Sequence, residues 1–119
     1  MGAEEADGDH FCHLVIPVRE YQRSIAFYEK VFGWRVVEQP ETGFWDILPP
    51  SGRGVSAELN AEAEVVIPAI WTDDIEARLE SIEWHGGRKV KGKTTIDGGA
   101  HFALFEDPCG NLIALYSEG

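Results

Sequence analysis

Hydrophobic residues along this chain follow a strand pattern, then a helix pattern, then strand patterns again. Residues 10–18 are rich in β-branched and aromatic side chains, which predicts a strand. Residues 21–32 carry apolar side chains at helical spacing, and Gly33 marks the end of the predicted helix. Three short strands are predicted next, separated by turns rich in proline and glycine, at residues 34–38, 43–48 and 54–59.

The second half of the chain repeats this order. A strand is predicted at residues 65–72, and Asp73 or Asp74 can cap a helix that reaches residue 83. Gly86 and Gly87 supply the stop, and strands are predicted at residues 88–90, 100–106 and 112–117. Equivalent positions lie 54 residues apart, as with Ile16 and Ile70. This offset indicates an internal repeat.

The repeat predicts an α+β fold of two tandem βαβββ modules, at about residues 11–60 and 64–117. In one such module the helix covers one face of the sheet, so two modules can pair with their bare faces around a cavity. We therefore expect residues 10–119 to form one domain with a cupped, mixed eight-stranded sheet, preceded by a flexible acidic tail at residues 1–9.

The charge balance narrows the classes of partner. Ten Lys and Arg residues stand against 21 Asp and Glu residues, for a formal charge of -11. Such a surface repels nucleic acid and attracts cationic ligands. No apolar run approaches the ~20 residues that span a bilayer, and the acidic start does not resemble a signal peptide. Two cysteines are too few for a disulfide framework, so we expect a cytoplasmic protein with no membrane partner.

Several motifs resemble the vicinal oxygen chelate superfamily, which includes glyoxalase I, bleomycin-resistance proteins and extradiol dioxygenases. The resemblance covers residues 11–116 and is strongest to small proteins related to lactoylglutathione lyase, whose chemistry is undefined. It implies the paired βαβββ fold, a homodimer and a cupped site. The matching segments are His13-Leu-Val-Ile-Pro-Val18, Ser24-Ile-Ala-Phe-Tyr28, Val31-Phe-Gly-Trp34, Thr72-Asp-Asp-Ile75, Gly86-Gly87, Phe102-Ala-Leu-Phe105 and Asp107-Pro-Cys-Gly-Asn111.

The resemblance also implies four positions for metal ligands. It places the first on His13 and the second on Glu58, whereas the third and fourth fall on Ile67 and Ala114. Aliphatic side chains cannot bind an ion, and a catalytic divalent metal normally keeps three protein ligands. We therefore expect no cofactor, with Zn, Ni, Mn or Fe held by His13 and Glu58 as the alternative. His101 could add a ligand, but strand alternation points it away from the cavity.

Without a metal, His13 can act as a general base oriented by Glu58. Alternatively, Glu58 is simply an exposed residue at a strand end. A small-molecule cavity is predicted on the face that His13 shares with neighbouring residues of its strand, and Trp45 is the best candidate for stacking. The predicted ligand-binding residues are Val15, Pro17, Trp45, Phe102, Leu104, Ala114 and Tyr116.

Three functions stay open at this point. The first is a small-molecule-binding protein without a complete metal site, whose ligand is cationic or aromatic. The second is a metal-dependent lyase, isomerase or dioxygenase with an atypical ligand set. The third is a structural or regulatory dimer whose cavity is vestigial.

Overall fold

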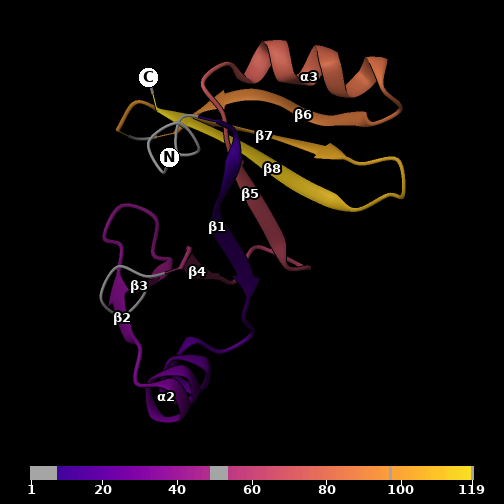
Figure 1. The fold of residues 1–119 in the computed structure, drawn as a ribbon. Helices are drawn as coiled ribbons and strands as arrows, with labels where there is room; N and C mark the ends of the chain where they lie inside the picture. Colours follow the sequence, from indigo (N-terminus) through magenta and orange to yellow (C-terminus); the bar gives the residue numbers. More distant parts are fainter. Residues whose placement is uncertain (1–7, 49–53, 97, 119) are drawn as a thin grey trace. The chain divides into compact units, whose positions relative to one another are not determined.

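The computed structural model describes residues 8–48, 54–96 and 98–118. Its elements follow the order β-α-β-β-β twice, as Figure 1 shows. The strands form an eight-stranded mixed sheet in the order β2-β3-β4-β1-β5-β8-β7-β6. This confirms the predicted α+β class with two βαβββ modules. The bounds are β1 His10–Pro17, α2 Tyr21–Phe32, β2 Arg35–Glu38, β3 Trp45–Leu48, β4 Ser56–Asn60, β5 Ile67–Trp71, α3 Ile75–Trp84, β6 Arg88–Thr95, β7 Ala100–Glu106 and β8 Leu112–Glu118.

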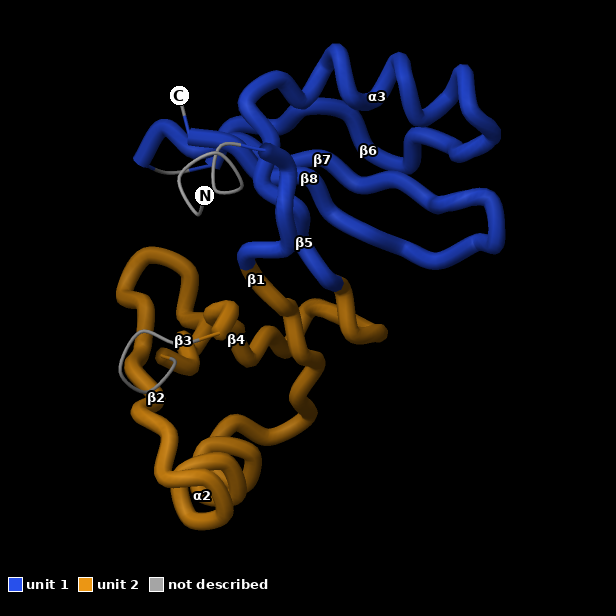
Figure 2. Tube along the Cα trace, viewed as in Figure 1, with its two compact units in different colours: residues 1–12, 68–119 blue, residues 13–67 orange. Residues whose placement is uncertain are grey.

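The chain divides into two compact units, which Figure 2 colours separately. Unit 1 contains residues 1–12 and 68–119, and unit 2 contains residues 13–67. The boundary falls inside β1, so the first residues of this strand belong to unit 1 and the rest to unit 2. Of the predicted acidic tail, residues 1–7 lie outside the described residues.

Unit 2 is built on a parallel pair formed by its first and last strands, β1 and β4. The antiparallel strands β3 and β2 extend the sheet from β4. A parallel pair requires a crossover connection, and α2 begins that connection on one face of the sheet. The buried core on this face consists of Val18, Ile25, Ile47, Ala57 and Leu59. Gly33 ends α2 in the left-handed conformation, at φ 70°, as its place in the sequence predicts.

Unit 1 repeats this arrangement. Strands β5 and β8 are parallel, whereas β7 and β6 continue the sheet in antiparallel pairs. Helix α3 lies along one face of these strands in Figure 1. Asp74 caps it by accepting a hydrogen bond from the Ala77 amide, which decides between the two aspartates that the sequence allowed. The core between α3 and the sheet consists of Ile75, Leu79, Ala103, Phe105 and Leu115.

The strand bounds differ from the sequence prediction by one or two residues at several strands and by five residues at β6. β6 runs to Thr95, past the predicted end at residue 90, and its pairing with β7 is interrupted by register shifts. The sequence pattern does not predict the full length of β6, because its lysines leave little alternation of apolar and polar residues. β5 begins at Ile67, whereas Val65 and Val66 before it are exposed and outside the strand.

The two glycines after α3 have different roles. Gly86 adopts a φ of 101°, which is the left-handed conformation expected of a helix stop. Gly87 is required by close packing instead. A Cβ at Gly87 would lie 2.5 Å from Ile82 Cγ2 and 2.9 Å from the Glu106 carbonyl oxygen.

The turn between β7 and β8 is organised by the Asp107 carboxylate. It accepts hydrogen bonds from the backbone amides of Cys109 and Asn111 and from the Asn111 side chain. The hydrogen bond from the Asn111 side chain, together with these backbone amides, holds the pKa of Asp107 below its usual value. This Asx-type turn sets the register of the β7–β8 hairpin.

None of the helices in the described part of the chain is long and apolar enough to cross a membrane.

Replacing Gly87 by alanine is predicted to lower the free energy of unfolding by about 1–3 kcal/mol, because the new methyl group overlaps Ile82 and the Glu106 backbone. Gly92→Ala is the matched control, since the nearest atom to its added Cβ is 4.0 Å away. Urea unfolding of both variants measures the difference. Equal stabilities for the two variants would contradict this packing constraint.

Asp107→Asn tests the charge in the β7–β8 turn. A carboxylate whose pKa is lowered in the folded state stabilises it above the pKa of the unfolded chain, and this contribution is lost as the pH falls through the folded pKa. The wild type is therefore predicted to melt at a higher temperature than the variant at pH 7. The gap should begin to shrink below about pH 4 and close as the pH falls through the lowered pKa of Asp107 in the folded state. A gap that is constant between pH 7 and pH 3 would show that the charge plays no part.

Candidate functional site

His13 lies on the face of unit 2 that α2 does not cover. Its strand neighbours Leu14 and Ile16 pack against the core under α2. Since side chains alternate along a strand, His13, Val15 and Pro17 project from the opposite face.

A row of four hydrogen-bonded polar side chains crosses β1 and β4 on this face; we call it the polar row. His13 Nδ1 lies 2.7 Å from Ser56 Oγ, and His13 Nε2 lies 3.3 Å from Glu58 Oε1. Asn60 Nδ2 donates to Glu58 Oε2 at 2.9 Å. The parallel register pairs His13 with Ser56 and Val15 with Glu58, so the row follows directly from strand pairing.

The partners of His13 fix which ring nitrogen carries the proton. An ionised carboxylate only accepts hydrogen bonds, so Nε2, which faces Glu58, is the protonated nitrogen of the neutral ring. Nδ1 then accepts a hydrogen bond from the Ser56 hydroxyl group. The arrangement can accept a proton at Nδ1 and stabilise the resulting imidazolium with Glu58. It can equally bind a ligand through the solvent-accessible atoms of the side chains in the polar row.

The polar row is partly accessible to solvent. The His13 side chain is 26% exposed and the Glu58 side chain 16% exposed. Glu58 is therefore not the freely exposed strand-end residue that the sequence left open. Its carboxylate is held between His13 and Asn60, with both oxygens engaged.

A second carboxylate extends the row onto β3. Asp46 is the cross-strand partner of Glu58, so the two side chains project from the same face of the antiparallel pair. Both oxygens of Asp46 lie within 2.8 Å of the Gln39 amide nitrogen. This face of unit 2 therefore carries two carboxylates beside one imidazole, and Arg35 projects from the same face on the neighbouring strand β2.

The residues present do not fit the complete metal site that the superfamily's metal-dependent members use. Two of the four implied positions hold Ile67 and Ala114, which have no ligand atom. Both ring nitrogens of His13 face protein partners. Within residues 8–48, 54–96 and 98–118, no three His, Cys, Asp or Glu side chains come together as a group that could hold an ion. His101, the predicted reserve ligand, contacts Thr95 Oγ1 through Nδ1 at 3.0 Å.

Four other predicted binding residues lie together in unit 1. Phe102 pairs with Tyr116 and Leu104 pairs with Ala114 across β7 and β8. Their neighbours Ala103 and Leu115 pack under α3, so these four side chains occupy the opposite face of the strands. The Lys91 ammonium lies 5.7 Å from the centre of the Phe102 ring. Burial raises the pKa of the Tyr116 hydroxyl, with a further contribution from the charge of Glu118.

Trp45 is not brought together with His13. It packs against the core under α2, and its cross-strand partner is the fully buried Leu59. Alternation explains this placement, because the neighbouring Asp46 occupies the face of the polar row. The structure thus separates the predicted stacking residue from the predicted histidine.

Ser56 and Asn60 belong to the polar row but were not among the residues predicted for the site. A signal for both was present, since residues 56–60 read polar, apolar, polar, apolar, polar. Such alternation predicts a strand with Ser56, Glu58 and Asn60 on one face. The sequence does not give the parallel register of β1 and β4, which places Ser56 beside His13.

Two curated proteins are similar to this chain over most of its length. The uncharacterized protein YwbC of Bacillus subtilis is 32% identical over 121 residues, which cover 89% of this chain and 95% of YwbC. The anthracycline biosynthesis protein DnrV of Streptomyces peucetius is 28% identical over 116 residues, or 81% of this chain. This match spans only 42% of the length of DnrV.

A solved structure and a family model agree with these matches. A glyoxalase/bleomycin resistance protein/dioxygenase superfamily member from Vibrio splendidus has the same fold, with a TM-score of 0.67 and 16% identity over 93% of this chain and 99% of that one. The model of the Glyoxalase/Bleomycin resistance protein/Dioxygenase superfamily matches residues 10–115. The chain therefore belongs to the Glyoxalase/Bleomycin resistance protein/Dioxygenase superfamily.

Proposed function

We propose that this chain binds a small cationic molecule at the polar row of unit 2 and that it does so without a complete metal centre. The observation that carries the proposal is the hydrogen-bonded arrangement of His13 between Ser56 and Glu58. These side chains converge on one sheet face and remain partly accessible. A few convergent polar groups are typical of small-molecule sites.

The charge of the face supports a cationic ligand. Glu58 and Asp46 lie on neighbouring strands of this face, and the whole chain carries a formal charge of -11. The long-range field attracts cations, and the partly buried Glu58 carboxylate adds a short-range contact. The partly exposed His13 imidazole offers an aromatic surface against which a ring of the ligand can pack.

The donor set supports binding that does not depend on a metal. His13 and Glu58 supply two of the three protein ligands that a catalytic divalent ion normally keeps. The name of the relative DnrV, an anthracycline biosynthesis protein, is consistent with a role in small-molecule chemistry. The alternative is a lyase, isomerase or dioxygenase that binds Zn, Ni, Mn or Fe through an atypical set.

A double-mutant cycle tests whether His13 and Glu58 act as a pair. His13→Ala, Glu58→Ala and the double variant are predicted to give a coupling energy of about 0.5–2 kcal/mol in urea unfolding, because the two side chains share a partly buried hydrogen bond. The same cycle with His13 and the exposed Glu38 is the control, with an expected coupling near zero. Equal coupling in the two cycles would refute the pairing.

Binding of benzyltrimethylammonium, an aromatic quaternary ammonium ion, tests the ligand class. Calorimetric titration is predicted to detect binding to the wild type, and Glu58→Gln should weaken it about tenfold by removing a partly buried charge. Glu38→Gln removes an equal charge from an exposed position of the same unit and should leave the affinity nearly unchanged.

Two results would count against the proposal. Equal affinities for the Glu58 and Glu38 variants would place the cation elsewhere. The second such result would come from metal analysis of the purified protein. If it contains stoichiometric Zn, Ni, Mn or Fe that His13→Ala loses, the metal-dependent alternative replaces the proposal.

A further inference from the structure

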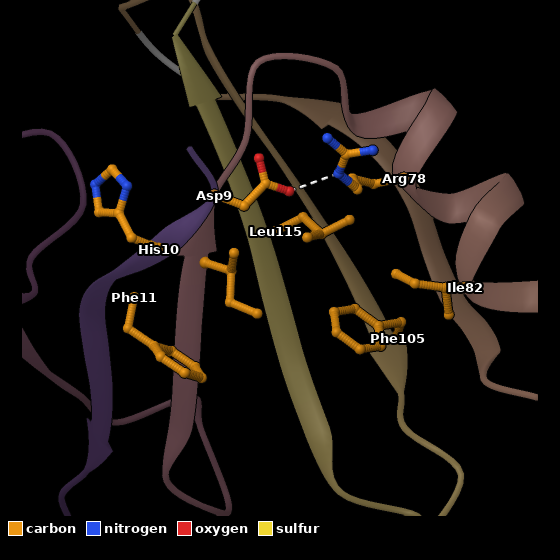
Figure 3. A pocket seen from close by; sticks show the side chains of 8 residues that line it. Asp9, His10, Phe11, Arg78, Ile82, Phe105 and Leu115 are labelled. Carbon is orange, nitrogen blue, oxygen red and sulfur yellow. Dashed lines mark hydrogen bonds and ion pairs between the residues drawn. The ribbon is translucent and has the colours of Figure 1, made fainter. Parts of the chain in front are cut away.

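Unit 1 contains a hollow that is separate from the polar row, and Figure 3 shows it from close by. Its volume is about 300 Å³. The apolar side chains of Phe11, Ile82, Phe105 and Leu115 line it, and they come from β1, α3, β7 and β8. The hollow thus lies on the face of the sheet that α3 covers, beside the core of unit 1.

An ion pair stands at the edge of this apolar hollow. Asp9 Oδ2 accepts a hydrogen bond from Arg78 Nε, and the Arg78 and Asp9 side chains are 44% and 31% exposed. Arg78 precedes Ile82 by one helical turn, so both project from the same side of α3. The hydrogen bond from Arg78 holds the pKa of Asp9 below its usual value, so the carboxylate is ionised at neutral pH.

We infer that this hollow binds an aromatic carboxylate, with its ring between Phe11 and Phe105 and its carboxylate on the Arg78 guanidinium. The volume is about twice that of a cavity known to admit benzene, which suits a ligand of two fused rings. A guanidinium presents several donors in one plane and matches a carboxylate in a forked geometry. The ring would lie against apolar side chains while its charge stays at the partly exposed edge.

In this arrangement the Asp9 carboxylate competes with the ligand carboxylate for Arg78. It occupies the position on Arg78 that the ligand carboxylate would take. A ligand carboxylate that binds Arg78 through Nε and one Nη must displace Asp9 from Nε. The apparent affinity is then the intrinsic affinity multiplied by the fraction of molecules in which Asp9 has released Arg78. Removing the Asp9 charge is therefore expected to strengthen binding, which is the opposite of what loss of an ordinary contact residue does.

The test uses 2-naphthoate as the probe and 2-naphthylmethanol as its neutral counterpart, at about 0.15 M salt to limit long-range repulsion by the acidic chain. Methyl NMR spectra follow the resonances of Ile82 and Leu115, which line the hollow. Asp9→Asn should bind naphthoate at least about threefold more tightly, and Arg78→Gln about tenfold more weakly. The affinity for the neutral probe should change little in either variant.

Glu80→Gln is the matched control, because it removes one negative charge from an exposed position of the same helix. It should not strengthen naphthoate binding as Asp9→Asn does. Arg78→Lys keeps the positive charge but loses the planar pair of donors. Its affinity for naphthoate should lie between those of the wild type and Arg78→Gln, provided that the methyl spectra show both variants folded. The inference is overturned if naphthoate leaves the Ile82 and Leu115 resonances unmoved, or if Asp9→Asn and Glu80→Gln bind it equally.

Discussion

The first and last strands of each module pair in parallel, and this pairing determines where the helices, the cores and the polar row lie. β1 pairs with β4, and β5 pairs with β8. Parallel neighbours cannot be joined by a tight turn, so each module needs a crossover, and its helix covers one face of the sheet. The apolar cores collect under α2 and α3. In unit 2 the other face of the sheet then carries the polar row without disturbing the core.

The same pairing assembles the candidate site. The register of β1 and β4 sets His13 beside Ser56, and one step of alternation brings Glu58 and Asn60 into the polar row. Each of these side chains forms a hydrogen bond with another member of the row. A partly buried imidazole and carboxylate can therefore lie on a sheet face without leaving their polar groups unpaired, which would destabilise the fold. Superfamily membership does not determine the chemistry of this row, because one fold can carry many unrelated activities. The row itself has to be tested.

The fold could be predicted from the sequence to a large extent because its signals are local and occur twice. Gly33 ends α2, Asp74 caps α3, and equivalent apolar positions recur in both halves. The site was harder to predict because it depends on register, which alternation alone does not give. The sequence pointed to His13 and Glu58 but not to Ser56 and Asn60, which the structure places beside them, and Trp45 lies on the opposite face from the one proposed for it. The Asp9–Arg78 pair joins residues 69 positions apart, which no local pattern reveals.

A crystal structure of the protein grown with benzyltrimethylammonium shows whether the polar row binds a cation without a metal. Density for the ammonium group is expected against the Glu58 carboxylate, on the face shared by His13 and Asp46. A metal ion coordinated by His13 and Glu58, or the ammonium ion bound away from this face, would contradict it.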